Sequence, residues 1–145
     1  MKLYLDNSFL NRPFDDSTVA LHEGESDVLS LIIHRVRKGE IQIVNSAVIE
    51  FENSRSPFPE AQEYIEQIMT LASEYQDLTE SVKHRANELV KTYNLMLLDA
   101  RHLAGAEIAK VDLFITCDYA IPKRYKGGLH VVTPLTFLDN YEYRS

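Results

Sequence analysis

Acidic residues follow the predicted strands of this chain, each within a few residues of the strand's end. In an open α/β sheet the carboxyl ends of parallel strands meet at one edge, where ligands bind. We therefore expect these side chains to lie close together. A further acid, which opens a helical segment, is expected beside the same edge. The acids concerned are Asp6, Glu50, Glu52, Asp118 and, at the start of the helical segment, Asp99.

Converging carboxylates repel one another unless a cation neutralises them, and hard divalent ions such as Mg²⁺ prefer oxygen ligands. A metal held by these acids would polarise a phosphoryl oxygen and lower the pKa of a bound water, so no His or Lys base is required. One metal would serve, and so would two that lie about 3.5–4 Å apart. Ser8 and Thr116 are short hydroxyls beside the acids, suited to holding a water or a phosphate, or to ordinary turn hydrogen bonds. The pattern predicts metal-assisted hydrolysis of a phosphate ester.

Each acid also has a plainer interpretation when it is taken alone. Asp6 and Asp118 are suitable helix caps, and Asp99 is a suitable first-turn acid near the positive end of a helix dipole. Glu50 and Glu52 are both suitable surface residues. The combination of two strand-end aspartates with a helix-start aspartate, in one alternating chain, favours a shared site.

Strand and helix patterns alternate, which is typical of a parallel sheet covered by helices on both faces. At 145 residues the chain, 1–145, is predicted to be a single domain. We expect an α/β fold with three α/β/α layers and a central, mostly parallel sheet of four to five strands. Helices at 59–73 and 79–93, with no strand pattern between them, are predicted to form a helical hairpin inserted between two strands. The strands are predicted at 2–5, 41–44, 111–116 and 129–132, and the other helices at 24–38, 46–53, from Asp99 onward and at 135–141.

The bulk composition places the chain among globular proteins. A net charge of −7 argues mildly against non-specific nucleic-acid binding, although site acids contribute to that charge and a bound cation changes the local sign. No apolar run is long enough to cross a bilayer, and the first acid, Asp6, comes too early for a signal peptide. The single cysteine, Cys117, excludes an internal disulfide and a Cys-based zinc site. We expect a cytoplasmic protein with no membrane partner.

Several blocks, in order along the chain, resemble the PIN-domain ribonuclease family, which includes the toxins of bacterial and archaeal toxin–antitoxin pairs. Segment 3–8 is similar to that family's strand, Asp, variable residue and Ser/Thr. Segment 98–106 is similar to its Asp-Ala-x-His helix, and segment 114–118 to its Thr-x-Asp ending. Segment 46–52 resembles the second block, whose acid usually lies six residues after the Ser. That spacing points to Glu52.

This resemblance implies an endoribonuclease that hydrolyses RNA phosphodiester bonds with Mg²⁺ or Mn²⁺. It also implies a frequent homodimer, and often an antitoxin protein whose segment blocks the site. The catalytic and metal-binding residues that it implies are Asp6, Asp99, Asp118 and one glutamate, Glu52, with Glu50 as the alternative. The two glutamates face different sides of a helix, so only one should be a ligand.

Two other functions stay open. One is a non-catalytic binding or regulatory module with the PIN fold, although such a module has no need of mutually repelling acids. The other is a phosphatase that uses Asp6 as nucleophile, as haloacid-dehalogenase-like enzymes do. Those enzymes carry a second Asp two residues on, where this chain has Ser8.

Two basic side chains near the acids have predicted supporting roles. His102 lies three residues after Asp99, on the same side of its helix, and we expect a packed or supporting residue there, not a metal ligand. Arg12 is predicted as a phosphate contact.

Overall fold

A computed structural model describes residues 1–142 of the chain and contains one open sheet. All neighbouring strands run parallel. The strands are β1 (Lys2–Leu5), β2 (Gln42–Ser46), β3 (Glu74–Gln76), β4 (Leu113–Ile115) and β5 (Val131–Val132). Their order across the sheet is β3-β2-β1-β4-β5, with β1 at the centre.

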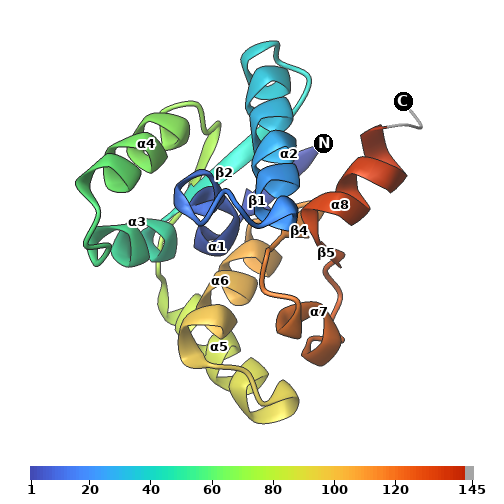
Figure 1. The fold of residues 1–145 in the computed structure, drawn as a ribbon. Coiled ribbons are helices and arrows are strands. Elements are labelled where there is room, and N and C mark those ends of the chain that lie inside the picture. Colours follow the sequence, from blue (N-terminus) through green and yellow to red (C-terminus); the bar gives the residue numbers. More distant parts are fainter. Residues whose placement is uncertain (143–145) are drawn as a thin grey trace.

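Helices connect and flank the strands (Figure 1). Four of them begin at a residue whose side chain accepts a backbone N–H, and these caps are Asp6, Ser46, Thr79 and Thr133. The helices are α1 (Asn7–Leu10), α2 (Ala20–Arg37), α3 (Ala47–Ser54), α4 (Pro59–Met69), α5 (Glu80–Tyr93), α6 (Leu97–Ile108), α7 (Ala120–Arg124) and α8 (Pro134–Phe137). A short 3₁₀ helix, η1 (Arg12–Phe14), and a π-helical turn, η2 (Leu138–Glu142), complete the set.

The central strand shows that both faces of the sheet are covered. Successive side chains of a strand point to opposite faces, and Leu3, Tyr4 and Leu5 of β1 are all fully buried. Strands buried on both faces are characteristic of parallel sheets in α/β proteins. The predicted α/β fold with a parallel sheet is thus confirmed.

The prediction of a hairpin formed by helices 59–73 and 79–93 is wrong. A fifth strand, β3, lies between α4 and α5 and pairs with the end of β2, with Ser46 opposite Gln76. Because β3 occupies the sheet edge, α5 packs against α6 instead, so the inserted helical pair consists of α5 and α6 (Figure 1). Strand β3 has only three residues, and two of them, Glu74 and Tyr75, are exposed. No apolar pattern in the sequence therefore indicates a strand here.

Other boundaries differ less. The long helix α2 begins at Ala20, four residues before the predicted start, and two short helices that were not predicted, α1 and η1, precede it. Helix α7, which contains Pro122, was not expected from the sequence. No helix within residues 1–142 has both the length and the apolar character to cross a membrane.

Candidate active site

Asp6 lies where the central strand β1 ends and α1 begins. Its backbone N–H donates to the Ile115 carbonyl at 3.2 Å, which joins the end of β1 to the end of β4. Its Oδ1 accepts the Phe9 N–H at 3.2 Å as a helix cap, and the Ser8 hydroxyl at 2.6 Å. Burial raises the pKa of Asp6, while hydrogen bonds from the Ser8 hydroxyl and the Phe9 N–H favour the carboxylate. Asp6 is therefore both a structural cap and a buried acid at the sheet edge.

The hydroxyls predicted to support the site lie between the two strand-end aspartates. Ser8 Oγ accepts the Cys117 N–H at 3.0 Å and lies 3.2 Å from Thr116 Oγ1. Thr116 Oγ1 accepts the Asp118 N–H at 3.0 Å, so the Asp118 turn is tied to the residues beside Asp6. Ser8 and Thr116 thereby fix the relative position of the two acid-bearing turns.

A separate chain of hydrogen bonds runs from Ser46 through Tyr4 and His102 to Glu52. The Tyr4 hydroxyl lies 2.7 Å from Ser46 Oγ and 2.7 Å from His102 Nδ1. His102 Nε2 lies 2.9 Å from Glu52 Oε1. Every member is satisfied when Ser46 donates to Tyr4, Tyr4 donates to Nδ1, and Nε2–H donates to the Glu52 carboxylate. Burial raises the pKa of Tyr4, which keeps the phenol protonated for this role. We call Tyr4, Ser46 and His102 the neutral network.

Asp99 lies in the first turn of α6, where the charges of other acids act on it. Burial raises its pKa to about 6, and the charges of Asp118, Asp6 and Glu52 add to the effect. Like charges act in this way only when they lie near one another, so Asp6, Asp99, Asp118 and Glu52 lie in one region.

The two glutamates of α3 point in different directions. Glu50 is exposed, and its Oε1 accepts the Tyr75 hydroxyl of β3 at 2.7 Å. Glu52 contacts His102 and acts on the charge of Asp99. Glu52 therefore lies on the side of α3 that faces Asp99, and its role as a metal ligand stays a prediction.

The acidic side chains suit a hydrated hard cation better than a metal ion enclosed entirely by protein ligands. Within residues 1–142, no group of three or more His, Cys, Asp and Glu side chains is arranged to hold a metal. Mg²⁺, however, retains several waters and commonly takes one or two protein carboxylates. Carboxylates whose repulsion raises the pKa of Asp99 fit such an ion, which would relieve that repulsion.

A second buried network, which the sequence did not suggest, lies behind Asp118. Glu25 of α2 is fully buried, and its Oε1 accepts the Arg12 Nε–H at 2.8 Å. Its Oε2 accepts the Tyr119 hydroxyl at 2.7 Å. Arg12 Nη1 also donates to Asp15 at 2.9 Å, so the guanidinium predicted to contact phosphate is engaged by two acids. We call Arg12, Glu25 and Tyr119 the ionic network.

The sequence did hold one signal for this network. Glu25 is followed by Val28, Leu29 and Ile32, all buried on the same face of α2. A carboxylate within the apolar stripe of a helix requires a buried partner. The sequence gives no indication that the partner is Arg12.

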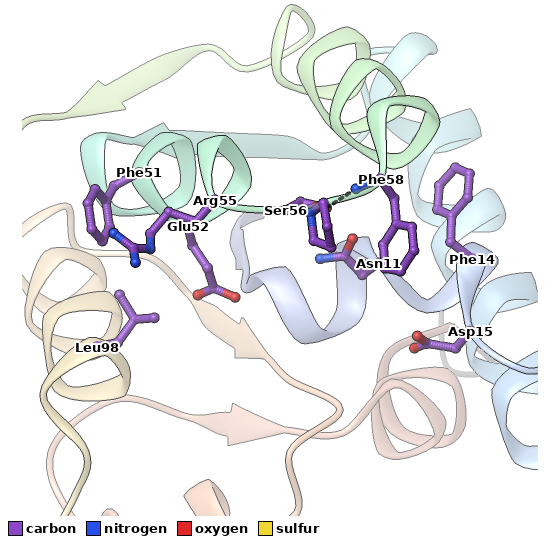
Figure 2. Close-up of a pocket in the computed structure, with 10 residues that line it drawn as sticks. Asn11, Phe14, Asp15, Phe51, Glu52, Arg55, Ser56, Phe58 and Leu98 are labelled. Atoms are coloured by element: carbon purple, nitrogen blue, oxygen red, sulfur yellow. Dashed lines mark hydrogen bonds between the residues drawn. The ribbon is translucent and has the colours of Figure 1, made fainter.

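A groove of about 490 Å³ opens beside Glu52 (Figure 2). Its walls come from η1, from α3 and the turn that follows it, and from the start of α6. The residues that line it are Asn11, Phe14, Asp15, Phe51, Glu52, Arg55, Ser56, Pro57, Phe58 and Leu98.

Comparison with known proteins identifies the architecture. No protein-family model matches the chain, and no curated protein matches it significantly. Among solved structures, VapBC2 from Rickettsia felis, bound to a DNA fragment from its promoter, matches with a TM-score of 0.60 and 14% identity, over 92% of this chain and 98% of that chain. A toxin–antitoxin complex from Klebsiella pneumoniae matches with a TM-score of 0.60 and 18% identity, over 91% of this chain and 97% of that chain. The chain has a PIN-like fold. The PIN-like fold expected from the motif order is thus confirmed over almost the whole chain.

Proposed function

We propose that this PIN-like chain is a metal-dependent endoribonuclease that hydrolyses RNA phosphodiester bonds. The observation that carries the proposal is the electrostatic state of Asp99. Its pKa is raised to about 6, and besides burial the causes are the nearby charges of Asp118, Asp6 and Glu52. Carboxylates that lie close enough to raise the pKa of Asp99, at the edge of a parallel sheet, are suited to a cation that binds phosphate.

In this proposal Asp6, Asp99 and Asp118, with Glu52, hold Mg²⁺ or Mn²⁺. When bound, the ion supplies Lewis-acid polarisation of the phosphoryl oxygen and a bound water of lowered pKa. The protein's own contribution is positional. His102 Nε2–H orients Glu52 at 2.9 Å, and the hydroxyls of Ser8 and Thr116 tie the Asp6 and Asp118 turns together.

We further propose that the chain acts as the toxin of a toxin–antitoxin pair, with an antitoxin protein as its partner. The support is that both structures compared above are toxin–antitoxin complexes, and one chain of each is matched over more than nine-tenths of its length. Homodimerisation and a cytoplasmic location stay predictions from the sequence.

The test is cleavage of structured RNAs, tRNAs included, by the purified protein with Mn²⁺ or Mg²⁺, with EDTA, and with Asp6→Asn as the matched variant. We expect cutting that requires the metal and is lost in Asp6→Asn, with the fold retained by circular dichroism. Equal cutting by both proteins would overturn the assignment of the site.

A melting experiment with Mn²⁺ separates the remaining alternatives. A protein that binds the ion is stabilised by RT ln(1 + [L]/Kd), so the wild type should melt at higher temperature with Mn²⁺ present. No cutting and no thermal effect of Mn²⁺ would instead favour the non-catalytic binding module. A phosphoryl group trapped covalently on Asp6 would favour the phosphatase.

A further inference from the structure

The groove beside Glu52 gathers the exposed phenylalanine side chains of the molecule. The chain has six phenylalanines, and Phe9, Phe114 and Phe137 are fully buried. The other three are 42%, 52% and 65% exposed, and all of them line this groove. We call Phe14, Phe51 and Phe58 the phenylalanine groove.

Such a distribution points to a ligand. Exposed apolar side chains scattered singly over a surface need no explanation, but a contiguous group of large ones marks a binding site. The rings come from separate segments, Phe14 from η1, Phe51 from α3 and Phe58 from the turn before α4. The fold therefore assembles the group from distant parts of the sequence.

The polar groups of the groove indicate what kind of ligand it takes. The Arg55 guanidinium lies over the Phe51 ring, 5.5 Å from its centroid. Aromatic faces combined with a guanidinium form a stacking platform of the kind that binds unpaired nucleotides, because every base has a π-face and every linkage a phosphate. In a duplex the bases are already stacked on one another and cannot reach such rings.

The groove is also continuous with the proposed cleavage centre. In Figure 2 the Glu52 carboxylate lies between Phe51 on one side and Phe58 on the other. An RNA strand whose phosphate lies at the acids must place its neighbouring nucleotides along these walls. This step rests on the proposed function.

We propose that the phenylalanine groove binds unpaired bases of RNA next to the scissile phosphate, with Phe51 and Phe58 as stacking surfaces and Arg55 as a phosphate contact. The charge of the molecule makes stacking the main source of affinity. The chain carries a net charge of −7, and Arg12, the residue after Asn11 of the groove wall, is held by Glu25 and Asp15. Binding should accordingly depend little on salt.

The test is fluorescence anisotropy with a labelled single-stranded RNA of about eight nucleotides and with the same sequence in a duplex. An Asp6→Asn background with Mg²⁺ keeps the RNA uncut. Adding Phe51→Ala or Phe58→Ala should weaken binding of the single strand by about 5- to 150-fold, the range found for loss of one base stack. Leu135→Ala removes an apolar side chain that is 38% exposed on α8, outside the groove, and should change nothing.

Salt dependence gives a second readout. One phosphate contact on a single strand predicts about a threefold loss of affinity when NaCl is raised from about 50 to about 200 mM. Unchanged binding by both phenylalanine variants, or equal binding of single strand and duplex, would overturn the proposal. The first result would assign the exposed rings to a protein partner.

Failure of this inference and failure of the proposed function are distinguishable. If the wild type cuts RNA with metal and Phe51→Ala and Phe58→Ala retain the same kcat/KM, the groove assignment fails and the nuclease stands. If the wild type cuts nothing while the phenylalanine variants lose single-strand binding, the nuclease fails and the groove stands.

Discussion

Two buried polar networks lie next to the acids of this molecule, and they differ in charge. The neutral network joins Ser46, Tyr4 and His102 and ends on Glu52, which is partly exposed. The ionic network encloses the fully buried carboxylate of Glu25, whose partners are Arg12 and Tyr119. One network orients a site acid through uncharged donors, and the other anchors the Asp118 turn with a charge pair.

The difference predicts how each network fails. When a neutral donor or acceptor stays buried without its partner, the free energy of unfolding falls by the cost of desolvating that group, about 1–3 kcal/mol. A buried charge that loses its counterion costs more, about 3–5 kcal/mol, although the intact pair itself contributes little net stability. The ionic network should therefore dominate folding, and the neutral network should affect the site more than the fold.

The largest effect is expected from Arg12→Met. It leaves the Glu25 carboxylate buried beside Tyr119 without its ion pair, so the free energy of unfolding should fall by about 3–5 kcal/mol in urea titrations. Arg12→Met combined with Glu25→Leu removes both charges and should regain most of the loss. A loss below about 1 kcal/mol for Arg12→Met would contradict the ionic network.

Tyr4→Phe tests the neutral network. It removes the hydroxyl between Ser46 and His102, and the unfolding free energy should fall by about 1–3 kcal/mol. Because His102 loses the partner that sets its tautomer, Glu52 should lose its orientation and RNA cleavage should slow at saturating substrate. Wild-type cleavage by Tyr4→Phe would show that the network is purely structural.

Repulsion among the acids should lower the free energy of unfolding in a pH-dependent way. The pKa of Asp99 is raised to about 6 in the folded protein, so stability present below about pH 4 is lost as pH rises through 6. Asp99→Asn removes this loss. In EDTA it should raise the free energy of unfolding at pH 8 by about 1 kcal/mol, a value reduced for the partial exposure of the side chain. This gain corresponds to a rise of about 3 °C in melting temperature. At pH 4 we expect no difference, and an equal gain at both pH values would refute the role of charge.

The smallest effect is expected from Glu50→Gln. Glu50 is exposed and contacts Tyr75, away from the neutral network, so cleavage should match the wild type. Glu52→Gln is the matched variant on the same helix, and it should lose metal-dependent cleavage. If Glu50→Gln lost cleavage and Glu52→Gln kept it, Glu50 would be the acid of the cleavage centre, and the neutral network would orient a residue that cleavage does not need.

The sequence predicted the parallel sheet, its central strand and the acids at its edge, since each depends on local patterns. Apolar runs mark β1 and β4, and a threonine cap followed by a first-turn proline, Thr133 and Pro134, marks the start of α8. Strand β3 could not be predicted, because its pairing with β2 supplies the stability that its three residues lack.

Contacts between distant residues explain what the sequence missed at the site. Tyr4 reads as one more core residue of a strand, and only the fold brings its hydroxyl to Ser46 and His102, 42 and 98 residues away. Likewise, Tyr119 is 94 residues from Glu25 in the sequence. Hydroxyl partners of this kind leave no periodic signal.

The most direct test of the central claim is a crystal structure of the protein grown with MnCl₂, with anomalous scattering to locate the ion. We predict a manganese peak coordinated by carboxylate oxygens from among Asp6, Asp99 and Asp118, with Glu52 in its coordination sphere or hydrogen-bonded to its waters. A peak elsewhere on the molecule, or none at these acids at saturating Mn²⁺, would contradict the assignment of a metal-dependent cleavage centre.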